Sequence, residues 1–259
     1  MSRGVIGRQS STTLSLEPTP SPLLRAHWRN LAMFNYEVTP GVLEPLVPPG
    51  TELDDFHGRL FVSLIGFQFL RASLLHIPIP LHRHFAEVNL RFYVKRKAED
   101  GWHHGVVFIR ELVPRRAVAL SAALLYNEPY RTLPLRERVD MDGADAGAPG
   151  HVRYEWRLHR QWQHLEAMTE GKPTPLEPGS EADFIATRHW GYGTFHDGRG
   201  IEYHVRHPRW SIWNVHRHDL RCDVAELYGQ RFVAPLSQPP ASVFVADGSE
   251  VSVSRWRGI

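Results

Sequence analysis

The sequence predicts a mainly β protein with a few peripheral helices, and two observations carry this prediction. From residue 151 onward, short strand-like runs alternate with turn residues, and no long helical pattern interrupts them. Upstream, residues 87–94 and 105–116 form two strand-like runs that hold ionised groups where a core is expected. Charge inside apolar strands indicates that a polar compartment lies beside them.

The elements before the charged runs follow from apolar spacing and turn residues. Residues 25–34 are amphipathic and predict either a helix or a strand. Residues 42–46 predict a helical turn, which ends at the turn residues Pro48, Pro49 and Gly50. Residues 59–70 are rich in aromatic and β-branched side chains and predict a strand.

The first charged run alternates with the period of a strand. One face is apolar, and the other face is polar and consists of Glu87, Asn89, Arg91 and Tyr93. The polar face meets water, a partner or a pocket. The second run is apolar on both faces up to Arg110 and Glu111, which predicts a strand covered on both sides. An unpaired ion there costs several kcal/mol, so these charges need partners.

A buried helix is predicted over residues 115–126, because Pro114 suits its start and the following residues are apolar around most of the circumference. Arg115 and Arg116 would then meet the positive end of the helix dipole, and an anion would relieve that repulsion. The anion is either a carboxylate of this chain, from Glu87, Glu111 or Glu128, or a ligand carboxylate bound by the guanidinium groups. Both alternatives stay open.

The remaining elements are short. We expect a hairpin tip over 139–150, a Pro-rich loop over 172–179, a short helix over 223–228 and a hairpin over 242–253 that turns at Asp247 and Gly248. The strand-like segments of this half are 152–158, 183–185, 189–193 and 201–205. In the aromatic and histidine-rich part, His189 and Tyr192 are candidates for pocket lining, although such residues more often anchor a β core.

Composition limits the function classes. The formal net charge of +2 gives no basic footprint for nucleic acid or anionic membranes. The single cysteine, Cys222, excludes an intrachain disulfide, and no apolar run is long enough to span a bilayer. We expect a cytoplasmic protein with a disordered tail over 1–22 and a single domain over 23–259, and we leave self-association open.

No metal or cofactor site is expected. Three close histidine pairs stand out, but no HExxH, CxxC or facial carboxylate triad accompanies them. Phosphate-binding loops and the GxSxG elbow of hydrolases are also missing from the sequence. The histidine pairs are His82 with His84, His103 with His104, and His216 with His218.

Several motifs in order resemble the bacterial YqjF-like family of uncharacterised proteins, also called DUF2071. The resemblance begins near Trp28 and extends to the C-terminus; its motifs are at 48–54, 63–67, 87–94, 110–117, 125–130, 189–192 and 207–211. The resemblance implies a fold similar to that of acetoacetate decarboxylase, in which a curved antiparallel sheet closes into a cone or barrel around a cavity.

The chain departs from the decarboxylase at its catalytic lysine. In that enzyme an Arg-Glu pair is followed by Pro-Lys-Lys, and the first lysine forms a Schiff base, whereas this chain has Arg115 and Arg116 after Pro114. A guanidinium group cannot form that imine. Lys95 and Lys97 lie near the end of a predicted strand and are poor replacements.

The sequence therefore predicts a cavity that binds a small polar or anionic metabolite, a carboxylate or carbonyl compound, without Schiff-base chemistry. Glu87 and Glu111 are candidate acid and base residues. Candidate binding residues are Arg115, Arg116, Asn89, Arg91, Arg110, His189 and Tyr192. The alternative is a noncatalytic structural or regulatory binding protein whose buried charges serve only the fold.

Overall fold

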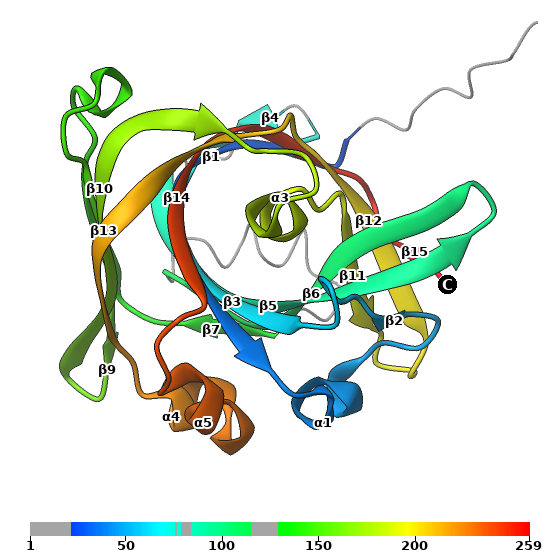
Figure 1. Ribbon diagram of the computed structural model, residues 1–259. Coiled ribbons are helices and arrows are strands. Elements are labelled where there is room, and N and C mark those ends of the chain that lie inside the picture. The colour runs from blue at the N-terminus through cyan, green and yellow to red at the C-terminus, as the bar shows by residue number, and fades with distance from the viewer. Residues whose placement is uncertain (1–21, 76, 79–83, 115–128) are drawn as a thin grey trace, which may run out of the picture.

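The computed structural model describes residues 22–75, 77–78, 84–114 and 129–259. Strands dominate, and all of the described strands belong to one large curved sheet (Figure 1). Before the charged strands the elements are β1 (Leu24–Val38), α1 (Pro40–Leu43), the 3-10 helix η1 (Glu44–Leu46), β2 (Glu52–Leu53), β3 (Leu60–Leu74) and β4 (Ile77–Pro78). The charged strands are β5 (His84–Ala98) and β6 (Gly101–Val113).

The second half continues with strands and short helices. These are β7 (Tyr130–Thr132), β8 (Leu135–Asp140), η3 (Ala144–Ala146), β9 (His151–Leu158), β10 (Gln161–Pro175), α3 (Glu181–Ala186), β11 (Trp190–Thr194), β12 (Gly200–Arg206), β13 (Ser211–Arg221), α4 (Val224–Tyr228), η4 (Gln230–Phe232), α5 (Val233–Leu236), β14 (Ser242–Val253) and β15 (Arg257–Gly258). In the described part of the chain, no helix is long and apolar enough to cross a bilayer.

The sheet closes on itself. Its strands follow the order β12-β11-β6-β5-β3-β1-β14, and a further pairing between β12 and β14 joins the two ends into a ring. Helix α3 lies inside this ring (Figure 1). Strands β13, β10, β9 and β8 continue the sheet from the other part of β14. A mainly β fold with a ring of strands is therefore confirmed.

Two apolar clusters pack on opposite faces of β5. Val88, Leu90 and Phe92 belong to the first cluster, which extends to β9, β10 and α4. Tyr93 belongs to the second cluster, which contains Ile185 of α3 and side chains of β12 and β14. The polar face of β5 therefore points into the ring, so the compartment predicted from its alternation is the interior of the protein.

Several predicted elements are confirmed, and the segment 25–34 is settled as a strand. It belongs to β1, which pairs with β3 on one side and β14 on the other. The helical turn at 42–46, the strands over 59–70, 87–94 and 105–113, and the short helix ended by Gly229 are also present. The tail over 1–21 and the helix over 115–126 lie outside the described residues.

Three local predictions are wrong, each because a non-local contact outweighs a short local signal. Segment 183–185 is part of helix α3, whose start is capped by Ser180 and whose Ile185 is buried against side chains of distant strands. Residues 242–253 form one strand because β1 pairs with β14 along its length, and Gly248 adopts φ +76° without reversing the chain. Residues 172–175 lie in β10, paired with β13, and are not a loop.

Candidate functional site

Two acidic side chains enter the interior from neighbouring strands. Glu87 of β5 is 7% exposed and Glu111 of β6 is 3% exposed. Antiparallel pairing places Asn89 opposite Glu111, so Glu87 lies diagonally across from Glu111 on the same face. A register shift between Leu90 and Arg91 marks a β-bulge in the β5–β6 pair. Both carboxyl groups therefore face the same interior space.

The two carboxyl groups interact directly. Burial raises the pKa of Glu87 to about 7, although hydrogen bonds with Asn89 and Glu111 lower it in part. The Asn89 amide donates from Nδ2 to Oε1 of Glu87 over 3.2 Å. A hydrogen bond between two carboxyl groups needs a proton on one of them, so one carboxyl group donates this hydrogen bond and the other accepts it. One group is then an acid and the other a base.

A small cavity of about 80 Å³ adjoins this pair, and we call it the carboxyl cavity. Glu87 and Glu111 are the carboxylic acids in its described lining, and the rest is mostly apolar or aromatic. The walls come from β1, β3, β5, β6, β7, β12 and β14 and from the segment after β14. The aromatic lining residues are Trp28, Phe69, Phe108, Tyr130, Tyr203 and Trp256.

Arg91, another residue on the polar face of β5, lies deeper against helix α3. Its Nη2 donates to the carbonyl oxygen of Ile185 over 3.0 Å, while its Nε has no hydrogen-bond partner in the described structure. It does not line the carboxyl cavity. The amide oxygen of Asn89 is also buried without a described partner. The polar face of β5 thus has a carboxyl end and a guanidinium end.

The structure adds a buried ion pair that sequence reasoning missed. Arg188, which follows α3, donates to Asp54 over 2.8 Å, and both side chains are 5% exposed. Burial lowers the pKa of Arg188, and Asp54 opposes that effect. Burial raises the pKa of Asp54, but the hydrogen bond with His104 and the charge of Arg188 lower it overall. Neither residue belongs to a strand-like charged run, so no local pattern indicated them.

Three other candidates lie away from the carboxyl cavity. Arg110 alternates with Glu111 and lies on the opposite face of β6. Burial raises the pKa of the Tyr228 hydroxyl on α4, and Arg110 lies near enough to oppose that effect in part. Tyr192 is buried in the cluster on that outer side and donates to the carbonyl oxygen of His103 over 3.3 Å. His189 lies against His207, with ring centroids 4.9 Å apart. Arg115, Arg116 and Glu128 lie outside the described residues.

Every lysine of the chain is described, and none lines the carboxyl cavity. The ammonium groups of Lys95 and Lys97 lie over the ring of Trp102, 5.4 and 5.1 Å from its centroid. Lys172 lies beside Gly147, at the far end of β10. Among the described residues, no lysine is therefore placed to form an imine with a ketone in this cavity.

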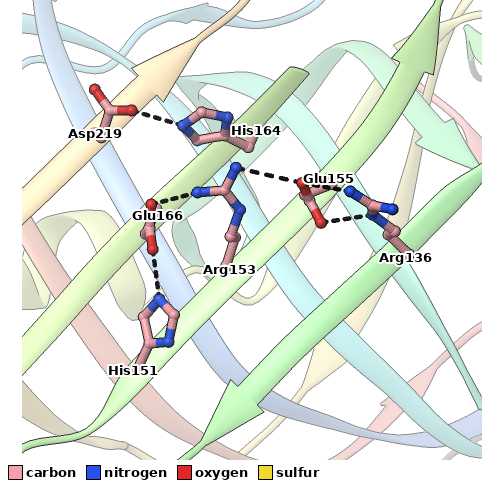
Figure 2. A network of polar contacts seen from close by, with 7 residues as sticks. All are labelled: Arg136, His151, Arg153, Glu155, His164, Glu166 and Asp219. Carbon is pink, nitrogen blue, oxygen red and sulfur yellow. Dashed lines mark hydrogen bonds and ion pairs between the residues drawn. The ribbon is translucent and has the colours of Figure 1, made fainter. Parts of the chain in front are cut away.

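A second group of ionisable residues lies on the sheet formed by β8, β9, β10 and β13 (Figure 2). His164, Glu166 and Asp219 have potential metal-ligating atoms within 4.8 Å of one another. However, Arg153 donates to Glu166 over 2.5 Å, and His164 pairs with Asp219 over 2.6 Å. Arg136 and Glu155 extend the same network. The charges compensate one another across the strands, which explains the cluster as an ion-pair ladder.

The sequence matches that of an established family along most of its length. The DUF2071 family, described as an uncharacterized conserved protein, matches residues 25–250. The chain belongs to the DUF2071 family. Among its relatives, the uncharacterized protein YqjF of Bacillus subtilis (strain 168) is 25% identical over 194 residues, which cover 74% of this chain and 76% of YqjF.

Solved structures show the same fold for this DUF2071 protein. Acetoacetate decarboxylase of Legionella pneumophila aligns with a TM-score of 0.61 and 13% identity over 98% of each chain. The enduracididine biosynthesis enzyme MppR, complexed with pyruvate, aligns with a TM-score of 0.64 and 16% identity over 99% of this chain and 98% of MppR. An acetoacetate decarboxylase-like enzyme of Sphingomonas wittichii RW1 aligns with a TM-score of 0.64 and 13% identity over 96% of this chain and 99% of the enzyme. The expected decarboxylase-like fold is confirmed.

Proposed function

We propose that the carboxyl cavity binds a small carbonyl compound and that Glu87 and Glu111 transfer protons to and from it without a Schiff base. The single observation that carries this proposal is the hydrogen-bonded carboxyl pair at the wall of an otherwise apolar cavity. A carboxylic acid beside a carboxylate, with a pKa near neutral, provides an acid and a base at the same pH.

The size and lining of the cavity limit the part of the ligand that enters it. Its volume of about 80 Å³ is smaller than the roughly 150 Å³ cavity known to hold benzene. The group next to the carboxyl pair therefore has only a few non-hydrogen atoms. Since the pair keeps a net negative charge when it holds one proton, an uncharged carbonyl or hydroxyl group is favoured there over a carboxylate.

The reaction that the pair supports is proton exchange beside a carbonyl group. The carboxylate removes a proton from the carbon next to the carbonyl, and the carboxylic acid donates its proton to the carbonyl oxygen, which gives an enol. Reversal returns the ketone and restores the pair with one proton. Acid and base act together, so the step needs no imine and no further reactant.

The test is deuterium incorporation into small ketones and 2-oxo acids in heavy water, followed by proton NMR. The wild-type protein should accelerate loss of the proton signal, and Glu87→Gln and Glu111→Gln should each reduce the rate about 100-fold or more. Glu170→Gln, on an exposed position of β10, is the matched control. Equal rates for wild type and both cavity variants would refute proton transfer by the pair.

The alternative is a noncatalytic protein whose interior charges serve only the fold. It predicts no exchange with any ketone and no thermal shift with small carbonyl compounds. Our proposal predicts a thermal shift that Glu87→Gln and Glu111→Gln reduce.

We expect the protein to act in the cytoplasm, since Cys222 is free and partly buried and a reducing compartment suits it.

A further inference from the structure

A second cavity, of about 400 Å³, lies on the outer face of the ring, and arginines dominate its charged lining. We call it the arginine cavity. Its described lining includes the guanidinium groups of Arg25, Arg206, Arg255 and Arg257 and one carboxylate, that of Glu202. Such an excess of one charge around a concave surface favours anions.

The arginine cavity and the carboxyl cavity lie on opposite faces of one wall. Arg206 follows Val205 along β12, and Ser252 precedes Val253 along β14. Both valines are buried in the apolar cluster that contains Ile185 of α3, inside the ring. Alternation therefore turns Arg206 and Ser252 outward. The hydrogen-bonded pairs of β14 with β12 and with β1 form the wall, so a ligand of the arginine cavity binds outside the ring.

Strand pairing accounts for the concentration of positive charge. Ser252 of β14 is opposite Arg25 of β1 on one side and opposite Arg206 of β12 on the other. Two arginines therefore flank one serine in a row across three strands. Neighbouring strands lie about 5 Å apart, so the two guanidinium groups extend from the same face at close range. Like charges in such a row repel each other, and a bound anion would relieve this.

Carboxylates of the chain compensate only part of this charge. Arg257 binds the fully buried Glu202 over 2.6 Å, and Arg25 reaches a surface glutamate at 3.6 Å, with both of those side chains about half exposed. In the described part of the chain, Arg206 and Arg255 form no ion pair. Two guanidinium groups thus remain available to an anion from solution.

Neutral donors lie beside these free guanidinium groups. Nε of Arg206 donates to Nδ1 of His204 over 3.1 Å, so Nδ1 is the unprotonated nitrogen of that ring. Burial, Arg206 and neighbouring histidines lower the pKa of His204 to about 4, so its proton near pH 7 is on Nε2, a hydrogen-bond donor. The ring is held against Trp190, with centroids 4.7 Å apart. The hydroxyl of Ser252 forms no hydrogen bond within the described residues.

A phosphate group suits this arrangement better than a carboxylate does. A phosphate monoester carries a charge of about −1.5 to −2 near pH 7 and three strong acceptor oxygens, whereas a carboxylate has two. The donors come from β1, β12, β14 and the segment after β14, which matches three oxygens better than two. The volume of about 400 Å³ is that of a small-molecule site. Trp190 and Tyr203 add aromatic surface for an organic part.

We propose that the arginine cavity is a second binding site, outside the ring, for the phosphate group of a small phosphate monoester. Arg206 and Arg255 provide the uncompensated charge, and Ser252 and His204 provide the neutral donors. This site does not depend on the carboxyl pair, so its test is independent of the proposed proton transfer.

The first experiment measures binding of inorganic phosphate and phenyl phosphate by isothermal titration calorimetry, with benzoate as the carboxylate counterpart. Wild type should bind phenyl phosphate at least tenfold more tightly than benzoate. Arg206→Gln/Arg255→Gln should weaken phosphate binding at least tenfold. The control Arg217→Gln/Arg221→Gln removes the same charge from exposed positions on β13 and should change it less than twofold. Failure of both phosphates to bind, equal weakening by both double variants, or equally tight binding of benzoate would overturn the proposal.

The second experiment places an anion of the chain itself at the centre of the row. Ser252→Glu puts a carboxylate between Arg25 and Arg206, so it should abolish measurable phosphate binding and raise the urea midpoint relative to the neutral control Ser252→Gln. Glu87→Gln, on the other side of the wall, should bind phosphate as wild type does. Retained binding in Ser252→Glu, or equal loss in Glu87→Gln, would show that phosphate binds elsewhere and would refute this site.

Discussion

The buried carboxyl pair predicts an unusual dependence of stability on pH, which Glu87→Gln should remove. The pKa of Glu87 is raised from 4.5 to about 7 in the folded protein, mainly by burial. Between these two values the folded state holds a proton that the unfolded state has lost. Stability from this group is therefore complete below about pH 4.5 and is lost as the pH rises through about 7.

The magnitude follows from the size of the shift. Each pKa unit corresponds to about 1.4 kcal/mol, so raising the pKa from 4.5 to about 7 lowers the free energy of unfolding by about 3 kcal/mol above pH 7. Between about pH 5 and pH 8 the loss should be about 2.5 kcal/mol. His204 and His207, whose pKa values are lowered to about 4, have the opposite effect below about pH 6.5. The comparison must therefore be a difference between wild type and variant.

The assay is urea unfolding of both proteins at several pH values between about 5 and 8. The stability of Glu87→Gln relative to wild type should rise by about 2.5 kcal/mol across this range, because the amide has no proton to lose. Glu170→Gln should follow the wild-type curve. Parallel curves for wild type and Glu87→Gln would refute the raised pKa and, with it, the shared proton.

Three further predictions concern the interior. Arg188→Met should destabilise the protein by about 3 kcal/mol because it removes a buried guanidinium partner from the buried carboxylate of Asp54. Arg199→Gln, at an exposed ion pair, should show no loss of stability by urea unfolding. Gly66→Ala should lower the free energy of unfolding by about 1–3 kcal/mol, since the new Cβ would lie 2.6 Å from the ring of Tyr154 in β9. Gly193→Ala is the control, because its new Cβ would lie 3.6 Å from its nearest neighbour. Borohydride reduction in the presence of ketones should give no covalent adduct by mass spectrometry, and a trapped lysine would contradict the absence of an amine from the cavity.

The charged strands were predictable because their information is local. Alternation in β5 places Glu87, Asn89 and Arg91 on one face whatever the rest of the chain does. The cost of burying ions then requires partners, which the structure provides for Glu87 through Asn89 and Glu111. The candidate acid and base residues could thus be predicted from the alternation of the strand and the cost of burying charged groups. The hydrogen bond between the two carboxyl groups could not, because it depends on the register of β5 against β6.

The misplaced candidates show where local reasoning ends. Arg110 and Glu111 are adjacent in sequence, and strand geometry sends them to opposite sides of β6. Tyr192 is a pocket-like residue by type but packs in the outer apolar cluster. The aromatic walls of the carboxyl cavity come from five strands and the segment after β14. No spacing within one strand reveals which residues of distant strands meet.

The sequence by itself determined the mainly β character, the polar face of β5 and the absence of a lysine suited to Schiff-base chemistry, because composition and strand period are properties of short segments. Tertiary structure alone decided the rest. The segment 183–185 became helical inside a ring of strands, and β12 joined β14 to close that ring. Pairing of β1 and β12 with β14 placed Arg25 and Arg206 on either side of Ser252. These outcomes depend on contacts between residues far apart in the chain, whose burial energy exceeds the small conformational preferences of a short segment.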